Sequence, residues 1–467
     1  MGENIRELAL ELLLEQEKGK EYLSRLERAV LDKYDYLDGR DKSFLKRVTE
    51  GTVERRIELD YYLNHFSSVP VSKMKPLIRC LLRMSVYQLL YMDNVPDSAV
   101  CNEACKLAVK RHFQNLRGFV NGVLRTVSRQ KDKLPLPDEK REPVKYFSVK
   151  YSMPEWLVEL WLDEYGWEIT ETLLEGLLKV HPISLRFRTA LTETEREELL
   201  RQIECRGAVA VAGKYLPYSC YLERTDNIGM LPGFGEGLYT VQDVSSALTV
   251  EAGRIRKSDF VVDVCAAPGG KSLLAAEKAA RVLARDISEE KTALIRENAE
   301  RMRVKNIEIE AFDATETDGA LLGRADVVFL DVPCSGLGVI GKKRDIKYRV
   351  TKESLSGLCD LQKRIVRASA EYVKPDGILV YSTCTIHRAE NEDMVRFIAR
   401  ELPFVPQTLE RVLPQELLDE KRALMERMKK SGKESGLTEE EEAACVQLLP
   451  GYMEADGFFI ACFRRKG

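Results

Sequence analysis

The stretch Asp263-Val-Cys-Ala-Ala-Pro-Gly-Gly-Lys271 joins an apolar run that begins at Phe260 to a helical run over residues 272–279. A strand that passes through a glycine-bearing turn into a helix is the first unit of an open α/β sheet, and ligands approach such a sheet at this turn. Gly269 and Gly270 leave room for a ligand beside the backbone, and the amino terminus of the next helix points toward polar ligand groups. Because glycine turns are common, this signal needs support from other residues.

Apolar runs alternate with helical stretches beyond this turn. The runs cover residues 260–264, 281–287, 307–312, 325–332 and 377–382, and a last one covers 456–463. Such alternation predicts a parallel sheet covered by helices on both faces, and we assign residues 238–467 to this α/β domain. The charge-dense stretch 409–446 is expected to be an exposed helical insertion before the last strand.

Acidic residues stand where the second and third apolar runs end. Asp286 is well placed to accept hydrogen bonds from ribose hydroxyls and disfavours a phosphorylated ribose, while Asp313 suits an adenine amino group. Either residue alone is equally consistent with a helix cap or a strand-end aspartate. Together with the glycine turn, they favour S-adenosylmethionine over a dinucleotide as the ligand.

Two cysteines each end an apolar strand: Cys334 in Asp331-Val-Pro-Cys-Ser-Gly and Cys384 in Tyr381-Ser-Thr-Cys-Thr. In the usual methyltransferase strand order these strands are neighbours, about 4.8 Å apart, so both thiols would face one pocket. Two thiols beside a methyl donor suit methylation of a pyrimidine ring carbon, which reacts only after a thiolate adds to the adjacent carbon. Small buried hydrophobes or a redox couple are the alternatives, and sequence alone leaves open which thiol attacks.

The bulk composition indicates a soluble multidomain protein of 467 residues, with 44% hydrophobic and 31% charged residues. Helical periodicity over residues 5–129 predicts a bundle spanning 1–130, and a charged, proline-containing connector follows at 128–143. Residues 145–237 are expected to form a small α+β domain, with a helix at 154–161 and a strand at 181–188. No apolar run approaches about 20 residues, so we expect a cytoplasmic protein without membrane contact.

The chain resembles two known families. Leu81-Leu-Arg-Met-Ser-Val-Tyr-Gln-Leu-Leu90 and Phe119-Val-Asn-Gly-Val-Leu-Arg125 resemble the helical RNA-binding fold of the NusB antitermination factor. The motifs at 263–271, 331–336 and 382–384 resemble the NOL/NOP/Sun RNA cytosine-C5 methyltransferases, in the branch that modifies 16S ribosomal RNA. Over nearly the whole chain, the resemblance implies a Rossmann-like S-adenosylmethionine-dependent methyltransferase domain preceded by an all-α NusB-like bundle and a small α+β domain.

The resemblance also implies roles for individual residues. Cys384 would be the nucleophile that attacks the base, and Cys334 would aid breakdown of the covalent adduct. S-adenosylmethionine would be bound by Cys265, Ala266, Ala267, Pro268, Gly269, Gly270, Lys271, Asp286, Asp313 and Asp331. The expected partner is 16S ribosomal RNA, unassembled or partly assembled, and we expect a monomer that needs no metal.

A basic segment follows the Cys334 turn, and we expect it to bind RNA. Its candidate substrate-binding residues are Lys342, Lys343, Arg344, Lys347 and Tyr348, where the cations suit phosphates and the tyrosine suits stacking on an unpaired base. A solvated charged loop is the alternative. The family pattern has proline at the place of Arg344 and asparagine at the place of Arg188. Lys106, Lys110 and Arg111 are further candidates for contact with flanking RNA.

Other cysteines and one histidine near the motifs are not expected to take part in the reaction. Cys101 and Cys105 lack accompanying zinc ligands and are expected in the core. His387 lies three residues after Cys384, but a Cys-His dyad is disfavoured because the family does not require this histidine. One alternative function is a noncatalytic RNA-binding factor, which leaves the glycine turn unexplained. A second alternative is the same methylation reaction on transfer RNA.

Overall fold

The computed structural model describes the chain except for residues 1–3, 180–181 and 226. It divides into two compact units. The helical unit comprises residues 1–163 and 342–349, and the sheet unit comprises residues 164–341 and 350–467. This division separates two units and places residues 342–349 in the first, so it does not test the three predicted domain boundaries.

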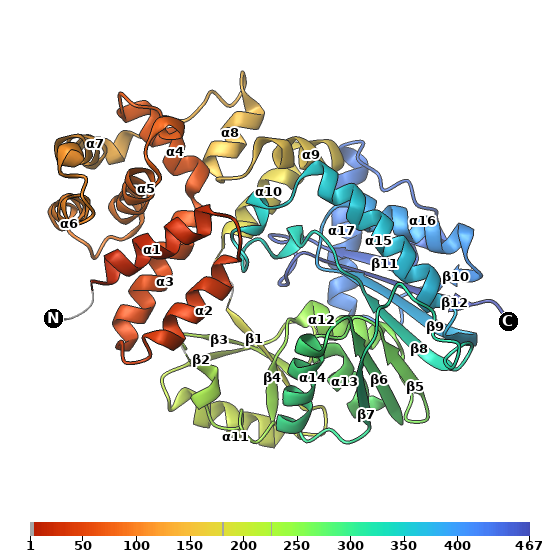
Figure 1. The fold of residues 1–467 in the computed structure, drawn as a ribbon. Helices are drawn as coiled ribbons and strands as arrows, with labels where there is room; N and C mark the ends of the chain where they lie inside the picture. Colours follow the sequence, from red (N-terminus) through yellow and green to blue (C-terminus); the bar gives the residue numbers. More distant parts are fainter. Residues whose placement is uncertain (1–3, 180–181, 226) are drawn as a thin grey trace. The chain divides into compact units, whose positions relative to one another are not determined.

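The helical unit is a bundle, drawn in red to yellow in Figure 1. Its core joins buried side chains at helical spacing, such as Leu8 and Leu12 of one helix and Ile78 and Leu82 of another. Cys101 and Cys105 are buried, as expected. The helices are α1 Ile5–Glu17, α2 Leu23–Lys33, α3 Gly39–Glu54, α4 Arg56–Phe66, α5 Pro76–Tyr91, α6 Asp97–Lys110, α7 Arg117–Gln130 and α8 Pro143–Lys150.

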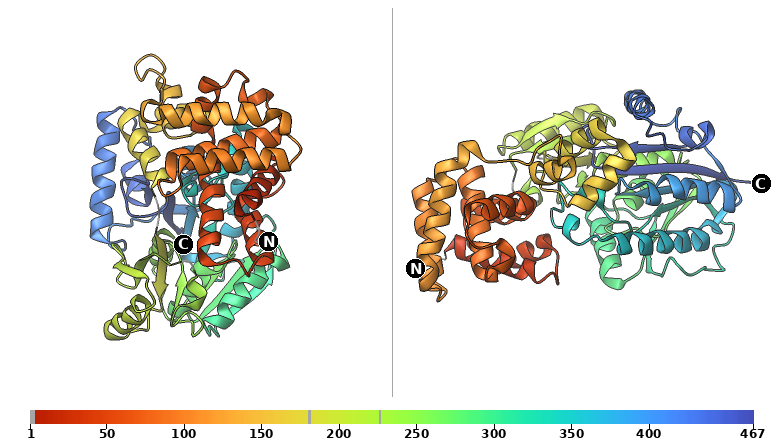
Figure 2. Two further views of the ribbon diagram at one scale, coloured as in Figure 1. Left: turned by 90° about the vertical axis from the view of Figure 1, so that its left-hand side faces the viewer. Right: turned by 90° about the horizontal axis from the view of Figure 1, so that it is seen from above.

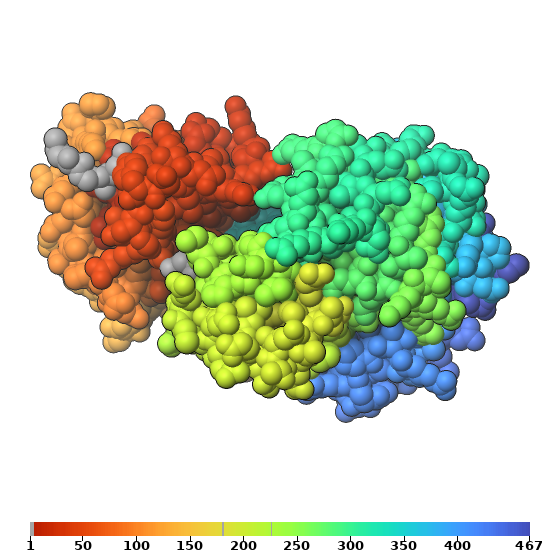
Figure 3. Space-filling model, turned by 90° about the horizontal axis from the view of Figure 1, so that it is seen from below, coloured from red at the N-terminus to blue at the C-terminus, as the bar shows by residue number. Residues whose placement is uncertain are grey.

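A four-stranded antiparallel sheet forms the first part of the sheet unit, in the order β2-β3-β1-β4. The strands are β1 Ile183–Phe187, β2 Val209–Ala212, β3 Ser219–Glu223 and β4 Tyr239–Val241. Strand β4 lies beyond residue 237, so the small sheet extends past the predicted boundary, and residue 181 of the predicted first strand lies outside the described residues. Figure 3 shows atoms of this segment in yellow-green on the face that it draws.

Three further helices follow α8 in the chain: α9 Glu155–Tyr165, which begins in the helical unit and ends in the sheet unit, α10 Trp167–Leu178 and α11 Glu193–Glu204. The helix predicted at 154–161 is confirmed by α9. The start of α11 is stabilised by a capping box, because the hydroxyl of Thr192 accepts from Glu195 N and the Glu195 carboxylate accepts from Thr192 N.

The larger sheet has the order β10-β12-β9-β8-β5-β6-β7, with β11 also paired to β12. Strands β5 to β9 pair in parallel, as predicted, but β12 runs antiparallel to β9, β10 and β11, so the expectation of a wholly parallel sheet is wrong at this edge. The strands are β5 Phe260–Asp263, β6 Arg281–Asp286, β7 Ile307–Ala311, β8 Ala325–Asp331, β9 Val373–Thr383, β10 Phe404–Pro406, β11 Cys445–Leu448 and β12 Phe458–Arg465.

Helices cover this sheet, as Figure 2 shows for α15 Lys352–Ala370 and α16 Glu392–Glu401 on one side of the strands. Their buried residues, including Val366 and Val395, share a core with Val328 of β8 and Leu379 of β9. Helices α12 Val244–Ala252, α13 Gly270–Lys278 and α14 Glu289–Arg301 also pack against strands of the sheet. The predicted α/β layering is therefore confirmed.

The charged stretch 409–446 contains more packed structure than its composition indicates. It forms α17 Gln415–Lys430 and α18 Glu439–Ala443, and its last residues begin β11. Leu417, Leu424 and Met428 lie seven and four residues apart on α17 and are buried. The expectation of an exposed insertion is wrong for these residues, because a charged helix can still bury one apolar stripe. Among the described residues, no helix has the length and apolarity required to cross a membrane.

Candidate active site at the carboxyl ends of the strands

The chain order of the larger sheet reverses between β5 and β8, since β6 and β7 continue on one side of β5 and β9 lies beyond β8 on the other. Ligands of open α/β sheets bind outside the carboxyl ends of strands at such a point. Asp263, Asp286 and Asp331 end β5, β6 and β8, and Cys384 directly follows β9. Three of the sequence-predicted residues, Asp286, Asp331 and Cys384, thus lie at the carboxyl ends of the strands together with Asp263.

The turn after β5 is held tightly to β6. Ala266 N donates to the carbonyl of Arg285 at 2.8 Å, and Ala267 N donates to Oδ2 of Asp286 at 2.9 Å. Gly269 has φ +106°, a conformation that favours glycine, and a Cβ at this position would lie 3.1 Å from Ile295 Cγ2. The peptide bond between Ala267 and Pro268 is cis. The turn therefore presents backbone to the crevice.

Two of the three acids predicted to bind the cofactor, Asp286 and Asp313, differ in their surroundings. Asp286 is buried and accepts from Ala267 N, Ile287 N and Lys291 Nζ, so it also holds the turn in place. Asp313 accepts through Oδ1 from the backbone and hydroxyl of Thr315, which lower the pKa of its carboxyl. Its Oδ2 has no partner among the described residues, and both carboxylates retain lone pairs for a ligand.

Asp263 is a candidate binding residue that the sequence did not single out. Its side chain is fully buried, and Ser272 Oγ donates to Oδ2 at 2.6 Å, but Oδ1 has no hydrogen-bond partner. Burial raises the pKa of this carboxyl to about 7. Since a buried polar atom without a partner is costly, the residue fits a site that a donor group of a ligand completes. Its place at the end of β5 was the available signal.

An ion pair connects the glycine turn to the cysteine strands. Lys271 Nζ lies 2.7 Å from Oδ2 of Asp331, and Ser382 Oγ donates to Oδ1 of the same carboxylate at 2.8 Å. The Lys271 ammonium also lies 5.1 Å from the centre of the Phe458 ring. Asp331 remains partly exposed, so it keeps the capacity to accept from a ligand as well.

The two cysteines meet in the structure. Asp331 pairs with Ser382 in the parallel ladder of β8 and β9, and Sγ of Cys334 lies 3.2 Å from Sγ of Cys384. This confirms the predicted strand adjacency. The hydrogen bond with Cys384 and burial raise the pKa of the Cys334 thiol well above its ordinary value. Either sulfur can be the donor of this contact.

His387 and Cys265, the other imidazole and thiol near the cysteine pair, are engaged by protein groups or buried. His387 Nδ1 lies 2.8 Å from Glu164 Oε1, so the ring forms an ion pair with a carboxylate and its pKa is raised. Burial raises the pKa of the Cys265 thiol, which disfavours a thiolate at this position. No group of three or more His, Cys, Asp or Glu side chains suitable for a metal occurs in the part of the chain that the structure describes.

The basic segment 342–349 packs within the helical unit. Lys347 is buried and donates to the carbonyls of Glu54 and Ser152 at 2.7 and 2.6 Å, and burial lowers the pKa of its ammonium to about 7. Arg344 pairs with Glu50 and Glu54. Lys347 and Arg344 are therefore bound by groups of the protein, which corrects the expectation that they belong to an open phosphate-binding loop. Lys342 and Lys343 are exposed.

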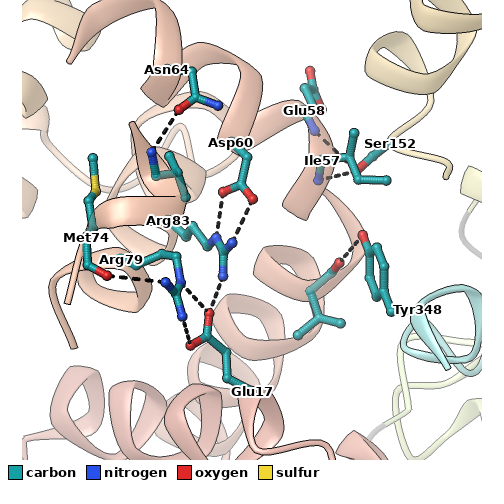
Figure 4. A network of polar contacts seen from close by, with 12 residues as sticks. Glu17, Ile57, Glu58, Asp60, Asn64, Met74, Arg79, Arg83, Ser152 and Tyr348 are labelled. Atoms are coloured by element: carbon teal, nitrogen blue, oxygen red, sulfur yellow. Dashed lines mark hydrogen bonds and ion pairs between the residues drawn. The ribbon is translucent and has the colours of Figure 1, made fainter. Parts of the chain in front are cut away.

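Tyr348 is also engaged by the helical unit. Its hydroxyl donates to the carbonyl of Val53 at 2.9 Å, and the Arg56 guanidinium lies 3.4 Å from its ring centre. Figure 4 shows the Tyr348 contact, and separately the network in which Glu17 pairs with Arg79 and Arg83, and Arg83 pairs with Asp60. One face of the ring is therefore covered by protein, which corrects the expectation of an open platform for an RNA base.

The other predicted RNA contacts lie on the surface of the helical unit. Lys106 pairs with Glu103 at 2.7 Å, and Lys110 with Glu7 at 2.5 Å. Arg111 pairs with Glu7 and Glu11. Exposed ion pairs of this kind are weak and exchange readily. Contact between these cations and RNA stays a prediction.

Comparisons with known proteins agree with this geometry. Residues 252–464 match the family model for the 16S rRNA methyltransferase RsmB/F, and residues 3–129 match the NusB family. The chain is 33% identical to the probable ribosomal RNA small subunit methyltransferase B of Bacillus subtilis, over 99% of both chains. It is 31% identical to the protein of the same name from Synechocystis, over 91% of both chains.

Solved structures show the same fold. The crystal structure of PH0851 has a TM-score of 0.76 at 22% identity and covers both chains fully. NSun6 from Pyrococcus horikoshii with SFG has a TM-score of 0.54 at 20% identity, over 66% of this chain and 97% of that one. The chain therefore belongs to the RsmB/F family of 16S ribosomal RNA methyltransferases, and S-adenosylmethionine is its methyl donor.

Proposed function

We propose that this protein methylates carbon 5 of a cytosine in 16S ribosomal RNA through a covalent bond between Cys384 and the base. The observation that carries the proposal is the 3.2 Å separation of the Cys334 and Cys384 sulfurs at the carboxyl ends of adjacent strands, beside the glycine turn. Methylation of a nitrogen or a hydroxyl oxygen needs no thiol pair, whereas a ring carbon must first be activated by a nucleophile.

The proposed reaction proceeds in four steps. The Cys384 thiolate adds to carbon 6, which makes carbon 5 nucleophilic, and carbon 5 then takes the methyl group as the sulfonium–methyl bond breaks. The carbon 5 proton leaves to a base. Finally the bond between carbon 6 and sulfur breaks, which restores the aromatic ring and the thiolate. Cys334 aids this breakdown, as the family resemblance implies, and its sulfur lies 3.2 Å from the sulfur of Cys384.

The residues at the strand ends fit S-adenosylmethionine, which supplies the methyl group. Asp286 and Asp313 suit the ribose and the adenine, and residues 265–271 suit close backbone contact. The unpartnered Oδ1 of Asp263 suits a positively charged donor such as the α-ammonium of the amino-acid moiety. Lys271 and Asp331 suit the polar edge of the cytosine.

We place the reaction in the cytoplasm, carried out by a monomer on ribosomal RNA that is not yet fully assembled. The target base must be unpaired or everted, because its ring carbons are shielded in a stacked duplex. The helical unit, which matches the NusB family, would supply additional RNA contacts.

The test is incubation of the purified protein with tritiated S-adenosylmethionine and one of three RNAs: deproteinised 16S RNA, assembled small subunit or transfer RNA. Labelled 5-methylcytosine in the deproteinised 16S RNA is the expected product, identified by nucleoside chromatography. Label in another nucleoside contradicts the carbon 5 assignment, and label confined to transfer RNA contradicts the substrate. Binding of RNA without any label favours a noncatalytic factor.

A further inference from the structure

Glu390 is a fully buried carboxylate directly behind the two cysteines. It ends a short 3-10 helix, Arg388–Glu390, that follows the Cys384 turn. No lysine or arginine pairs with it among the described residues. The Glu390 carboxylate accepts three hydrogen bonds, from Ser335 N at 2.9 Å, Ser335 Oγ at 2.5 Å and Gln362 Nε2 at 2.9 Å. An ionised carboxylate matches three donors, because it only accepts.

These bonds hold both sides of Cys334. Ser335 directly follows the cysteine, and its backbone and hydroxyl are both attached to Glu390. Pro333 directly precedes the cysteine, and its carbonyl accepts from Gln362 Nε2 at 3.0 Å. The same amide also donates to Glu390, so one carboxylate and one amide fix the turn on either side of the thiol.

The Cys384 turn is attached to the same group. Thr385 Oγ1 lies 2.7 Å from Ser335 Oγ, and since the Ser335 proton is directed to Glu390, Thr385 is the donor of this bond. The carbonyl of Cys384 accepts from Gly338 N at 3.1 Å. The residues that follow the two cysteines are therefore bonded to one another, with their orientation set by the carboxylate.

We propose that Glu390 is a positioning residue that sets the separation of the Cys334 and Cys384 thiols for the methyl-transfer cycle. The inference rests on the proposed function and adds a residue that touches neither base nor cofactor. Reaction rates depend steeply on sub-ångström placement of reacting groups, so a turn that drifts lowers turnover. A buried charge without a cation costs stability, which is consistent with retention for a positional role. The Glu390 charge also contributes to the raised pKa of Cys334.

The experiment compares full-length Glu390→Gln, Glu390→Ala and Glu390→Asp with a matched control, Glu392→Gln. Glu392 is buried two residues away and has no bond to either cysteine turn. In Glu390→Gln the amide NH2 faces a donor, so we expect kcat to fall at least tenfold, and further in Glu390→Ala, with KM for RNA and for the methyl donor changed less than about twofold. Glu390→Asp keeps the charge and should recover part of the loss.

A second readout measures the thiol separation without methyl transfer. Diamide accepts the two protons and two electrons that a thiol pair releases and becomes a hydrazine, while the two sulfurs form a disulfide. We expect peptide mapping to show the Cys334–Cys384 disulfide forming at least several-fold more slowly in Glu390→Gln than in the wild type and in Glu392→Gln. If Glu390→Ala does not fold, Glu390→Gln and Ser335→Ala provide the same comparison.

The outcomes separate the two proposals. If the wild type makes no 5-methylcytosine but its disulfide rate depends on Glu390, the proposed function fails and the positioning role stands. If Glu390→Gln matches the wild type in both kcat and disulfide rate, the positioning role is overturned. An equal loss in Glu392→Gln overturns it too, since burial of any carboxylate in this region would then explain the effect.

Discussion

Lys271 and Asp331 form an ion pair of 2.7 Å that joins the first turn of α13 to the end of β8. It connects the segment that follows the glycine turn with the strand that precedes the Cys334 turn. Addition of a thiolate to carbon 6 places negative charge on the pyrimidine ring, and an ammonium fixed beside the ring would stabilise that charge.

Lys271→Ala should therefore slow methyl transfer by about 100-fold, as expected when a fixed donor to a developing charge is lost. Single-turnover transfer of a tritiated methyl group measures this rate. Lys278→Ala is the matched control, because Lys278 lies on the same helix and pairs with Glu251. Equal rates for the two variants would contradict a role for the ion pair in the reaction.

The two thiols should differ in what their removal does. Cys384→Ala should abolish methylation, since no other described thiol is assigned to attack the ring, while Cys334→Ala should accumulate covalent RNA adduct because breakdown is impaired. Denaturing gels show the adduct as a shifted band. Cys205→Ala, which removes an exposed cysteine, is the control. An adduct in Cys384→Ala and none in Cys334→Ala would reverse the assignment.

Affinity for the cofactor should depend on pH through Asp263. Burial raises the pKa of its carboxyl to about 7, and only the ionised form pairs with an ammonium. The affinity for S-adenosylhomocysteine, which carries the same ammonium, should rise about tenfold from about pH 6 to about pH 8. Calorimetric titration measures it, and Asp263→Asn should remove the dependence. A wild-type affinity that does not change across this range would exclude the contact.

The raised pKa of Asp263 should also make the free energy of unfolding of the ligand-free protein depend on pH. Because the folded-state pKa of Asp263 lies above that of the unfolded chain, the native state binds more protons between about pH 4 and pH 7. This group therefore contributes stability at low pH that is lost as the pH rises through about 7. Urea unfolding of the wild type and Asp263→Asn across this range should show that difference.

Lys347 should contribute to stability through the helical unit. Lys347→Ala leaves the carbonyls of Glu54 and Ser152 without their donor, at a cost of about 2–4 kcal/mol in the free energy of unfolding. Lys343→Ala removes an exposed lysine of the same segment and should change that free energy by less than about 0.5 kcal/mol. Urea unfolding of the full chain, with limited proteolysis to report on the helical unit, compares them. Equal stabilities would contradict a structural role for Lys347.

Much of the fold and of the candidate site could be predicted from three short motifs in the sequence, at residues 263–271, 331–336 and 382–384. Their signals are local: an apolar strand, a tight turn and a reactive or acidic side chain follow one another within a few residues. The order of strands in this fold class then places Cys334 beside Cys384, and the two sulfurs lie 3.2 Å apart. Patterns of this kind depend on backbone geometry that neighbouring residues determine.

Tertiary packing alone decided the surroundings of the same residues. Lys347 looks like a solvated cation in the sequence, but its partners Glu54 and Ser152 lie hundreds of residues away in the chain. Glu390 is one acid among 75 acidic residues, and only folding brings Ser335 and Gln362 to it. Burial and hydrogen bonding depend on which distant segments pack together, so a charge pattern read along the chain does not determine whether a side chain faces solvent, RNA or protein.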